Sequence, residues 1–394
     1  MNHSDYLEPL DLSFLHRDKR QHPLILGNFI SSHAEKRFPD LDKADIAIIG
    51  VKEERNSQDN AGCSLAPDYV RKYLYDLYQG PYNTRIADLG NIRAGNTVED
   101  TYFAVKTVLS ELLENNVTPL IIGGSQDITY ANYQAYEELG QIINIVSVDS
   151  RFDIGLNKDE KLSHLNYLSK ILTHKPNYLF NYANIGYQTY FVDQDAIELM
   201  DKLYFDAYRL GEVRQNLEET EPIVRNADLL SFDVGSIRQS DAPGSGQASP
   251  NGFYGEEACQ IVRYAGLSDK LTSIGFYETN PAFDKGEQTA HLLAQMIWYF
   301  VDGFYHRKND YPDKHLKDSN AFVKYVVSIK EFQNKIAFYK SKKSNRWWME
   351  VPCPPNLQRK YSRQFLVPCS YKDYQEACQN EIPEKWWQVY QKFV

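Results

Sequence analysis

Residues 143–153, which read Ile-Asn-Ile-Val-Ser-Val-Asp-Ser-Arg-Phe-Asp, decide the fold. The stretch opens with a mostly apolar run of strand length and continues directly into Asp149 and Asp153. A run of this kind, without strict alternation of polar and apolar residues, predicts a strand that is buried on both faces. Ligands of parallel sheets bind at the carboxyl ends of strands, so chemistry is expected just after the run.

Similar runs recur along the chain and are separated by stretches of helical pattern, such as residues 100–115 and 256–265. This alternation predicts an α/β domain over residues 45–306 with three layers, α-β-α, and a mainly parallel central sheet. The other runs are residues 47–50, 119–124, 181–186, 229–234 and 271–277.

Composition bounds the class of protein. The 394 residues are 42% hydrophobic and 24% charged, which excludes a chain that is disordered throughout. The formal net charge of −10 argues against nucleic-acid binding, because phosphate contacts need clustered lysine and arginine. No apolar segment near the N-terminus is long enough to span a membrane, so membrane insertion is not expected. The five cysteines, in no metal-ligand spacing, favour a reducing, cytoplasmic location.

Charge divides the chain unevenly. Residues 311–394 contain 15 lysine and arginine residues against 8 acidic ones, so they carry +7 and the preceding residues carry −17. We therefore expect three parts: an N-terminal segment (1–44), the α/β domain (45–306) and a basic, Trp-rich C-terminal appendage (307–394) packed on the core. The appendage could instead bind an acidic partner, membrane headgroups or single-stranded nucleic acid.

Three strand ends carry polar clusters, at residues 123–127, 149–153 and 231–238. On physical grounds alone, Asp149, Asp153 and Asp233 at one sheet edge suggest a divalent-metal site. The alternative is that each aspartate only forms a turn or caps a helix.

These strand ends, in order, resemble those of the ureohydrolase superfamily, which comprises arginases, agmatinases and formimidoylglutamases. Further matches are residues 50–51, 66–71 (Ala-Pro-Asp-Tyr-Val-Arg), 242–244 (Ala-Pro-Gly) and 278–284 (Glu-Thr-Asn-Pro-Ala-Phe-Asp). The resemblance implies the arginase-like fold. It also implies a site in which histidines and aspartates hold two manganese ions that are bridged by a hydroxide. In such a site Glu278 would help to hold the guanidinium-like group of the substrate.

The sequence departs from the family pattern at three of the six metal-ligand positions, where Gln126, Arg151 and Gly235 stand. Only Asp149, Asp153 and Asp233 remain. A guanidinium has donors only and stays protonated, so it cannot replace a histidine ligand. We expect no bound cofactor, although the three aspartates could hold a single divalent cation weakly if Arg151 turned to solvent.

Arg238 stands where the family has Asp-Pro, and with Arg151 it is expected to supply counter-charge for the aspartates. His164 is a candidate general acid or base, with a polar surface residue as the plainer alternative. Glu278 could bind a small cationic ligand or simply pair with Arg151. Cys63 is a candidate nucleophile without a visible partner, and an inert thiol is favoured.

The sequence therefore predicts a catalytically degenerate ureohydrolase-fold protein with a binding or scaffolding role, and a protein partner docked through the appendage. The alternative is an active formimidoylglutamase-like or arginase-like hydrolase of amidine or guanidine C–N bonds that uses one metal or none. The family resemblance also leaves room for a homo-oligomer. The sequence does not identify a partner or a substrate.

Overall fold

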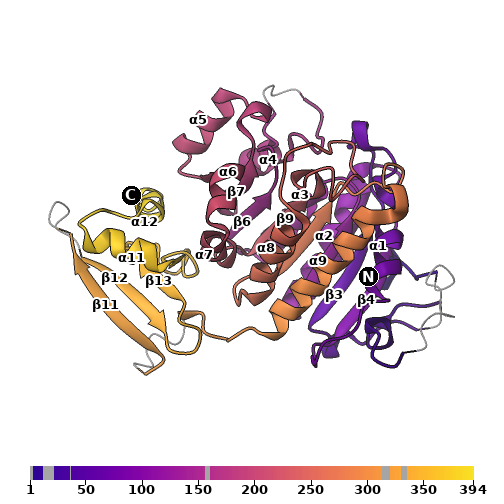
Figure 1. Ribbon diagram of the computed structural model, residues 1–394, viewed down its shortest axis with the longest axis horizontal. Coiled ribbons are helices and arrows are strands. Elements are labelled where there is room, and N and C mark those ends of the chain that lie inside the picture. Colours follow the sequence, from indigo (N-terminus) through magenta and orange to yellow (C-terminus); the bar gives the residue numbers. More distant parts are fainter. Residues whose placement is uncertain (1–2, 12–21, 36, 156–159, 313–319, 330–334) are drawn as a thin grey trace.

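A mostly parallel sheet lies at the centre of the protein (Figure 1). The computed structural model describes residues 3–11, 22–35, 37–155, 160–312, 320–329 and 335–394. Within these ranges the sheet has ten strands in the order β1-β4-β3-β5-β10-β9-β6-β7-β8, with β2 also paired to β4. The strands are β1 (Leu7–Glu8), β2 (Ser31–Ser32), β3 (Ile46–Val51), β4 (Ile86–Ile92), β5 (Thr118–Gly123), β6 (Ile143–Val148), β7 (Leu179–Tyr187), β8 (Asp206–Arg209), β9 (Leu229–Asp233) and β10 (Ser273–Tyr277).

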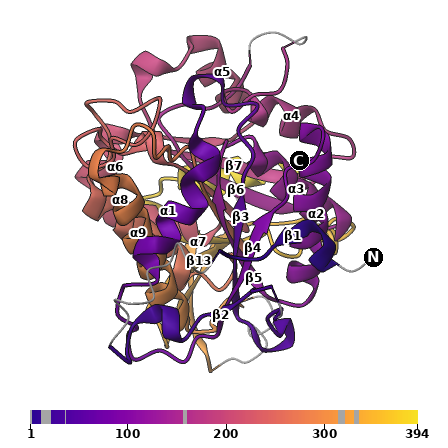
Figure 2. The same cartoon turned by 90° about the vertical axis from the view of Figure 1, so that its right-hand side faces the viewer.

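Helices cover both faces of this sheet because its strands are apolar on both sides. In β3, Ile46 and Ile48 join the hydrophobic cluster beneath α1, α8 and α9, whereas Ala47 and Ile49 join the one beneath α2 and α3. Figure 2 shows the two helix layers on opposite sides of the strands. The helices are α1 (Ala66–Leu74), α2 (Val98–Glu114), α3 (Ile128–Glu138), α4 (Tyr167–Thr173), α5 (Gln194–Lys202), α6 (Leu210–Gln215), α7 (Thr220–Arg225), α8 (Gly255–Leu267) and α9 (Gln288–Tyr305).

This architecture confirms the predicted three-layer α/β fold with a mainly parallel sheet. The pairs formed by β3, β5, β10, β9, β6 and β7 are all parallel, so their carboxyl ends meet at one edge. The N-terminal segment adds the two short strands β1 and β2, and β1 runs antiparallel to β4. None of the helices in the described ranges is long and apolar enough to cross a membrane.

The appendage forms a second sheet of its own, with antiparallel strands in the order β11-β12-β13-β14. Two helices pack on one face of it, where Phe338, Trp347 and Met349 meet Trp386 and Val389 (Figure 1). Its elements are β11 (Phe322–Ser328), β12 (Lys335–Ser341), β13 (Trp347–Glu350), β14 (Leu366–Cys369), α11 (Tyr371–Cys378) and α12 (Glu384–Gln391).

Buried charged groups join the appendage to the amino-terminal edge of the central sheet. Asp228, at the start of β9, is fully buried and accepts a hydrogen bond of 2.7 Å from Nη2 of Arg363, with the ammonium of Lys270 3.7 Å away. Arg225 donates to the carbonyl oxygens of Trp347 and Cys369. The appendage therefore sits at the edge of the sheet opposite to the strand ends that carry the predicted site.

Candidate functional site

Four of the predicted site residues meet at the carboxyl edge of the sheet. Gln126, Asp149 and Glu278 follow β5, β6 and β10, and Asp233 is the last residue of β9. These four strands lie side by side, and all four residues are buried. The backbone N–H of Gln126 donates to Oε1 of Glu278 over 2.7 Å. The amide Nε2 of Gln126 donates to Ser231 Oγ over 3.3 Å, so this side chain is held against β9.

The aspartates form a buried cluster of carboxyl groups. Asp149 Oδ1 accepts the N–H of Arg151 (2.8 Å) and Asp233 Oδ1 accepts that of Gly235 (2.7 Å). Burial raises the pKa of Asp149, and burial together with the charge of Asp149 raises the pKa values of Asp153 and Asp233 well above the usual range. The other oxygen of Asp149 is buried and has no hydrogen-bond partner among the described residues.

Two of the site carboxylates sit on left-handed backbone. Asp153 has a φ of +53° and Glu278 a φ of +65°. A φ in this range is uncommon for residues other than glycine, and backbone of this kind is concentrated at functional sites, where the surrounding structure holds it. The left-handed backbone in the loops after β6 and β10 therefore orients the side chains of Asp153 and Glu278 differently from the way an extended backbone would.

Glu278 is held by three donors from two other loops. Its Oε2 accepts from Ser57 Oγ (2.7 Å) and Asn60 Nδ2 (2.8 Å), and its Oε1 accepts, among the described residues, the N–H of Gln126 alone. Burial raises its pKa, and nearby His164 opposes that rise. Glu278 forms no ion pair with Arg151, which contradicts the alternative that Glu278 simply pairs with this arginine.

His164 is 3% exposed, which corrects the expectation of a surface residue. Its Nδ1 lies 3.1 Å from the carbonyl oxygen of Asn56 and its Nε2 lies 2.8 Å from Nε2 of Gln247. A carbonyl oxygen only accepts, so we assign the proton to Nδ1, and Nε2 then accepts from the Gln247 amide. Both ring nitrogens are thereby engaged, and His164 links two loops near Glu278.

Neither arginine forms an ion pair with the aspartate cluster, so direct pairing is wrong, although the charge of Arg151 still lowers the pKa values of the three aspartates through space. Arg151 forms no ion pair within the described residues; its guanidinium stacks on Phe191 instead. Arg238 donates from Nε to Asp241 over 2.9 Å and stacks on the ring of Tyr254. The guanidinium of Arg151 is held instead by the ring and the carbonyl oxygen of Phe191, which follows β7.

A small cavity of about 190 Å³ opens beside this cluster, lined among others by Arg151, Asp153, Leu165 and Phe191. Arg151 Nε is buried there without a partner among the described residues. Cys63 is buried elsewhere in the site, and burial and the charge of Glu278 raise the pKa of its thiol. A thiol with a raised pKa is a poor nucleophile, in agreement with the favoured inert thiol.

Comparison with known proteins decides the family. The model of the arginase family matches residues 44–302, which is more than half of the chain. The chain belongs to the arginase family. Its fold agrees with this: a crystal structure of Trypanosoma cruzi formiminoglutamase with manganese has a TM-score of 0.64, at 21% identity over 72% of this chain and 99% of that one.

Three further proteins are similar to this chain in sequence or in fold. Formimidoylglutamase of Staphylococcus haemolyticus is 25% identical over 66% of this chain and 86% of its own length. Formimidoylglutamase of Bacillus subtilis is 21% identical over 65% of this chain and 86% of its own length. The agmatine ureohydrolase of Thermoplasma volcanium has a TM-score of 0.57 at 20% identity, over 71% of this chain and 94% of that one.

The side chains of this arginase-family site do not fit a pair of manganese ions. Gln126 offers an amide whose nitrogen is directed at Ser231, Gly235 offers no side chain, and Arg151 offers only donors. A Cβ on Gly235 would lie 3.2 Å from both carboxylate oxygens of Asp233. The described residues contain no group of three or more histidine, cysteine, aspartate or glutamate side chains arranged to hold a metal.

Sequence reasoning missed the residues that position the site. Ser57 and Asn60 bind Glu278 although they lie 221 and 218 residues away from it along the chain. Phe191, which holds Arg151, lies in a loop after β7. No local motif marks these three residues, because each contact depends on how distant loops fold over the same sheet edge.

Proposed function

We propose that the carboxyl-edge site of this arginase-family protein binds a small compound with an amidine or guanidine group, without hydrolysing it through two metal ions. The observation that carries the proposal is the contrast between the kept Glu278 and the replaced ligand positions Gln126, Arg151 and Gly235. A planar amidinium needs acceptors in its plane, and carboxylates supply them bidentately.

Acceptors with spare capacity support this assignment. Among the described residues, Oε1 of Glu278 accepts one hydrogen bond, and Oδ2 of Asp149 is buried without a partner. An ionised carboxylate oxygen has room for about two donors. Burial and then the charge of Asp149 raise the pKa values of Asp153 and Asp233, and a cationic ligand would relieve the second of these effects.

The second candidate is hydrolysis of amidine C–N bonds with one metal or none, and the similarity to formimidoylglutamases favours it. Such a reaction would need a general base for the attacking water. Asp153 is the candidate, because burial and the charge of Asp149 raise the pKa of its carboxyl group and so make its ionised form a stronger base than an ordinary aspartate.

The test measures binding and turnover on the same purified protein. We expect calorimetry to detect binding of arginine, agmatine or formimidoylglutamate, while release of urea or ammonia stays at background and elemental analysis finds less than one manganese per chain. Glu278→Asp should weaken binding, and Glu381→Gln, on the exposed surface, serves as its control. Two manganese ions per chain together with ammonia release would instead establish the hydrolase.

A further inference from the structure

A groove lies where the appendage meets the core, away from the carboxyl edge of the sheet. Its volume is about 350 Å³. Residues of β8, α6 and α7 form the core wall, and residues of α11 and α12 form the appendage wall. Both appendage helices lie beyond residue 302, where the arginase-family match ends, so this junction groove is not part of the family's common fold.

Carboxylates dominate the lining of the junction groove. Six acidic side chains face two lysines, Lys372 and Lys385. The acidic residues are Asp206, Glu212, Glu219, Asp373, Glu376 and Glu384. Only Glu376 among them has an ion pair within the described parts of the chain, a contact of 3.7 Å with Lys372. The groove therefore carries uncompensated negative charge.

The two walls repel each other electrostatically across the groove. Glu384 on α12 has its pKa raised first by burial and then by the charge of Asp206 on β8. The ammonium of Lys392 lies on the far side of Asn181 from Asp206 and offsets part of that charge, since both side chains bind the same amide. A cation placed between the walls would relieve the repulsion that remains.

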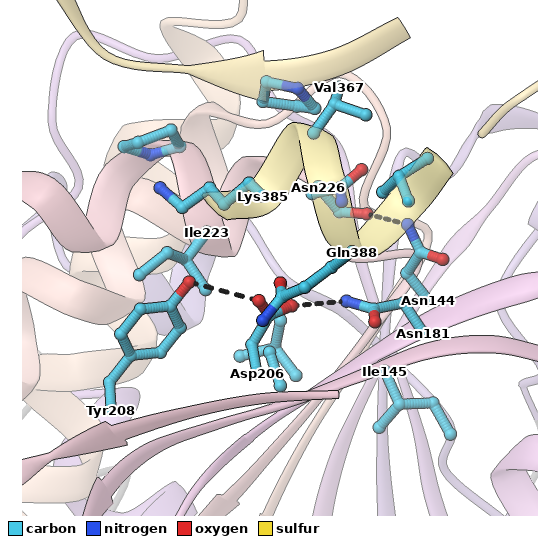
Figure 3. A pocket seen from close by; sticks show the side chains of 15 residues that line it. Asn144, Ile145, Asn181, Asp206, Tyr208, Ile223, Asn226, Val367, Lys385 and Gln388 are labelled. Atoms are coloured by element: carbon cyan, nitrogen blue, oxygen red, sulfur yellow. Dashed lines mark hydrogen bonds between the residues drawn. The ribbon is translucent and has the colours of Figure 1, made fainter. Parts of the chain in front are cut away.

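A narrower chamber continues the groove inward and shares Asp206, Tyr208 and Gln388 with it (Figure 3). Asn144 lines this chamber and is 2% exposed. Its Nδ2 donates to the carbonyl of Asn226 over 3.0 Å, whereas its Oδ1 is buried with no partner among the residues that the structure describes. Buried acceptors are normally satisfied by a donor, so the inner end has a place for an N–H group.

The spacing of the carboxylates indicates an extended cation and not a metal ion. They come from both walls, and the described residues contain no cluster of three or more that converges as metal ligands do. Val213 and Ile223 contribute apolar groups to the same lining. We propose that the junction groove binds a linear di- or triammonium compound, whose charged ends meet the carboxylates of the two walls and whose methylene chain lies along Val213 and Ile223.

Calorimetric titration of the full chain at low salt tests this site. The probes are 1,4-diaminobutane and 1,8-diaminooctane, with 1-aminobutane and Mg²⁺ as controls. We expect one diamine bound per chain, and weaker binding of the monoamine and the metal. Glu219→Gln and Glu384→Gln, on opposite walls, should each weaken diamine binding about threefold to tenfold, because each removes a charged acceptor.

Glu381→Gln is the matched control, since it removes the same charge just before α12 from a side chain that does not line the groove. It should bind the diamines as the parent does. Equal losses in all three variants would mean a diffuse counter-ion effect and would overturn the site. Absence of saturable binding by the parent, or binding of Mg²⁺ as tight as that of the diamines, would overturn the proposal as well.

Discussion

The guanidinium carbon of Arg151 lies 4.5 Å from the centre of the Phe191 ring, and its Nη1 donates to the carbonyl of the same phenylalanine. The arginine is thus anchored by a loop that follows β7, while its backbone N–H is bound to Asp149. Its positive charge acts on the aspartate cluster only through space, and it lowers the pKa values of Asp149, Asp153 and Asp233 less than burial raises them.

Arg151→Ala should therefore destabilise the protein moderately, by about 0.5–2 kcal/mol, because it removes a cation–π contact and one distant charge. A cost of about 3–5 kcal/mol, which is typical when one partner of a buried ion pair is removed, would contradict the stacked arrangement. Urea unfolding at pH 7 measures the difference. Arg151→Lys, which keeps the charge but not the planar stacking, separates the two contributions.

Asp153→Asn should stabilise the protein at pH 7, by roughly 1–2 kcal/mol, and should have little effect at pH 4. Burial raises the pKa of Asp153, so the folded state keeps a proton that the unfolded state releases above about pH 4. Stability is therefore lost as the pH rises from about 4 through the folded-state pKa. Asparagine is neutral at every pH and tolerates the left-handed backbone at this position.

Thermal unfolding from pH 4 to pH 8 checks this second prediction. Asp195→Asn, an exposed change on α5, is the control and should shift the melting temperature equally at both ends of the range. If the melting temperature of Asp153→Asn at pH 7 is equal to or below that of the parent, the folded protein does not disfavour ionisation of the Asp153 carboxyl group.

A triple variant, Gln126→His, Arg151→His and Gly235→Asp, should gain manganese binding by restoring the family's ligand set. Without metal it should melt below the parent, because the new carboxylate at 235 is forced close to that of Asp233. A hundredfold excess of Mn²⁺ over its dissociation constant would add about 2.7 kcal/mol. If Mn²⁺ does not change the melting temperature of the triple variant or of the parent, the loops do not place residues 126, 151 and 235 close enough together to bind a metal ion.

Arg363→Ala should destabilise the protein by about 3–5 kcal/mol, because among the described residues it leaves the buried carboxylate of Asp228 with Lys270, 3.7 Å away, as its cation. Limited proteolysis should also release the appendage sooner than in the parent. Arg359→Ala, a change of the same type at an exposed position of the appendage, is the control. Equal resistance of both variants to proteolysis would mean that other contacts hold the appendage.

Lys392→Met should flatten the stability profile between pH 8 and pH 10. Burial lowers the pKa of Lys392 to about 8, so over this range the unfolded chain binds more protons and the parent becomes more stable as the pH rises. The Nζ atom lies 5.4 and 4.9 Å from the ring centres of Phe180 and Phe205, and methionine can replace it between the rings. Chemical denaturation at several pH values, with the exposed change Lys285→Met as control, measures the slopes.

The sequence predicted the sheet and the meeting of Gln126, Asp149, Asp233 and Glu278, because parallel strands place their carboxyl ends at one edge. It did not predict where Arg151 and Arg238 point. Their directions depend on Phe191 and on contacts made by other loops, which no spacing along the chain encodes. The buried position of His164 between two loops could not be predicted for the same reason.

The junction groove also could not be predicted from the sequence. Asp206 and Glu384 lie far apart along the chain, and the excess of lysine and arginine in residues 311–394 suggested a positive appendage. The structure turns acidic side chains of α11 and α12 toward the core at this one place. The net charge of a region does not show on which face of a helix its acidic and basic side chains lie.

The burial of Asp228 between the two parts has a practical consequence for anyone who shortens this protein. A fragment that ends near residue 306 would match its relatives in length, but it would expose a carboxylate that is fully buried in the whole chain and would remove Arg363 from it. The same cut would uncover the aromatic ring of Phe180, which packs on Phe393. Recombinant work should therefore keep residues 307–394 joined to the central domain.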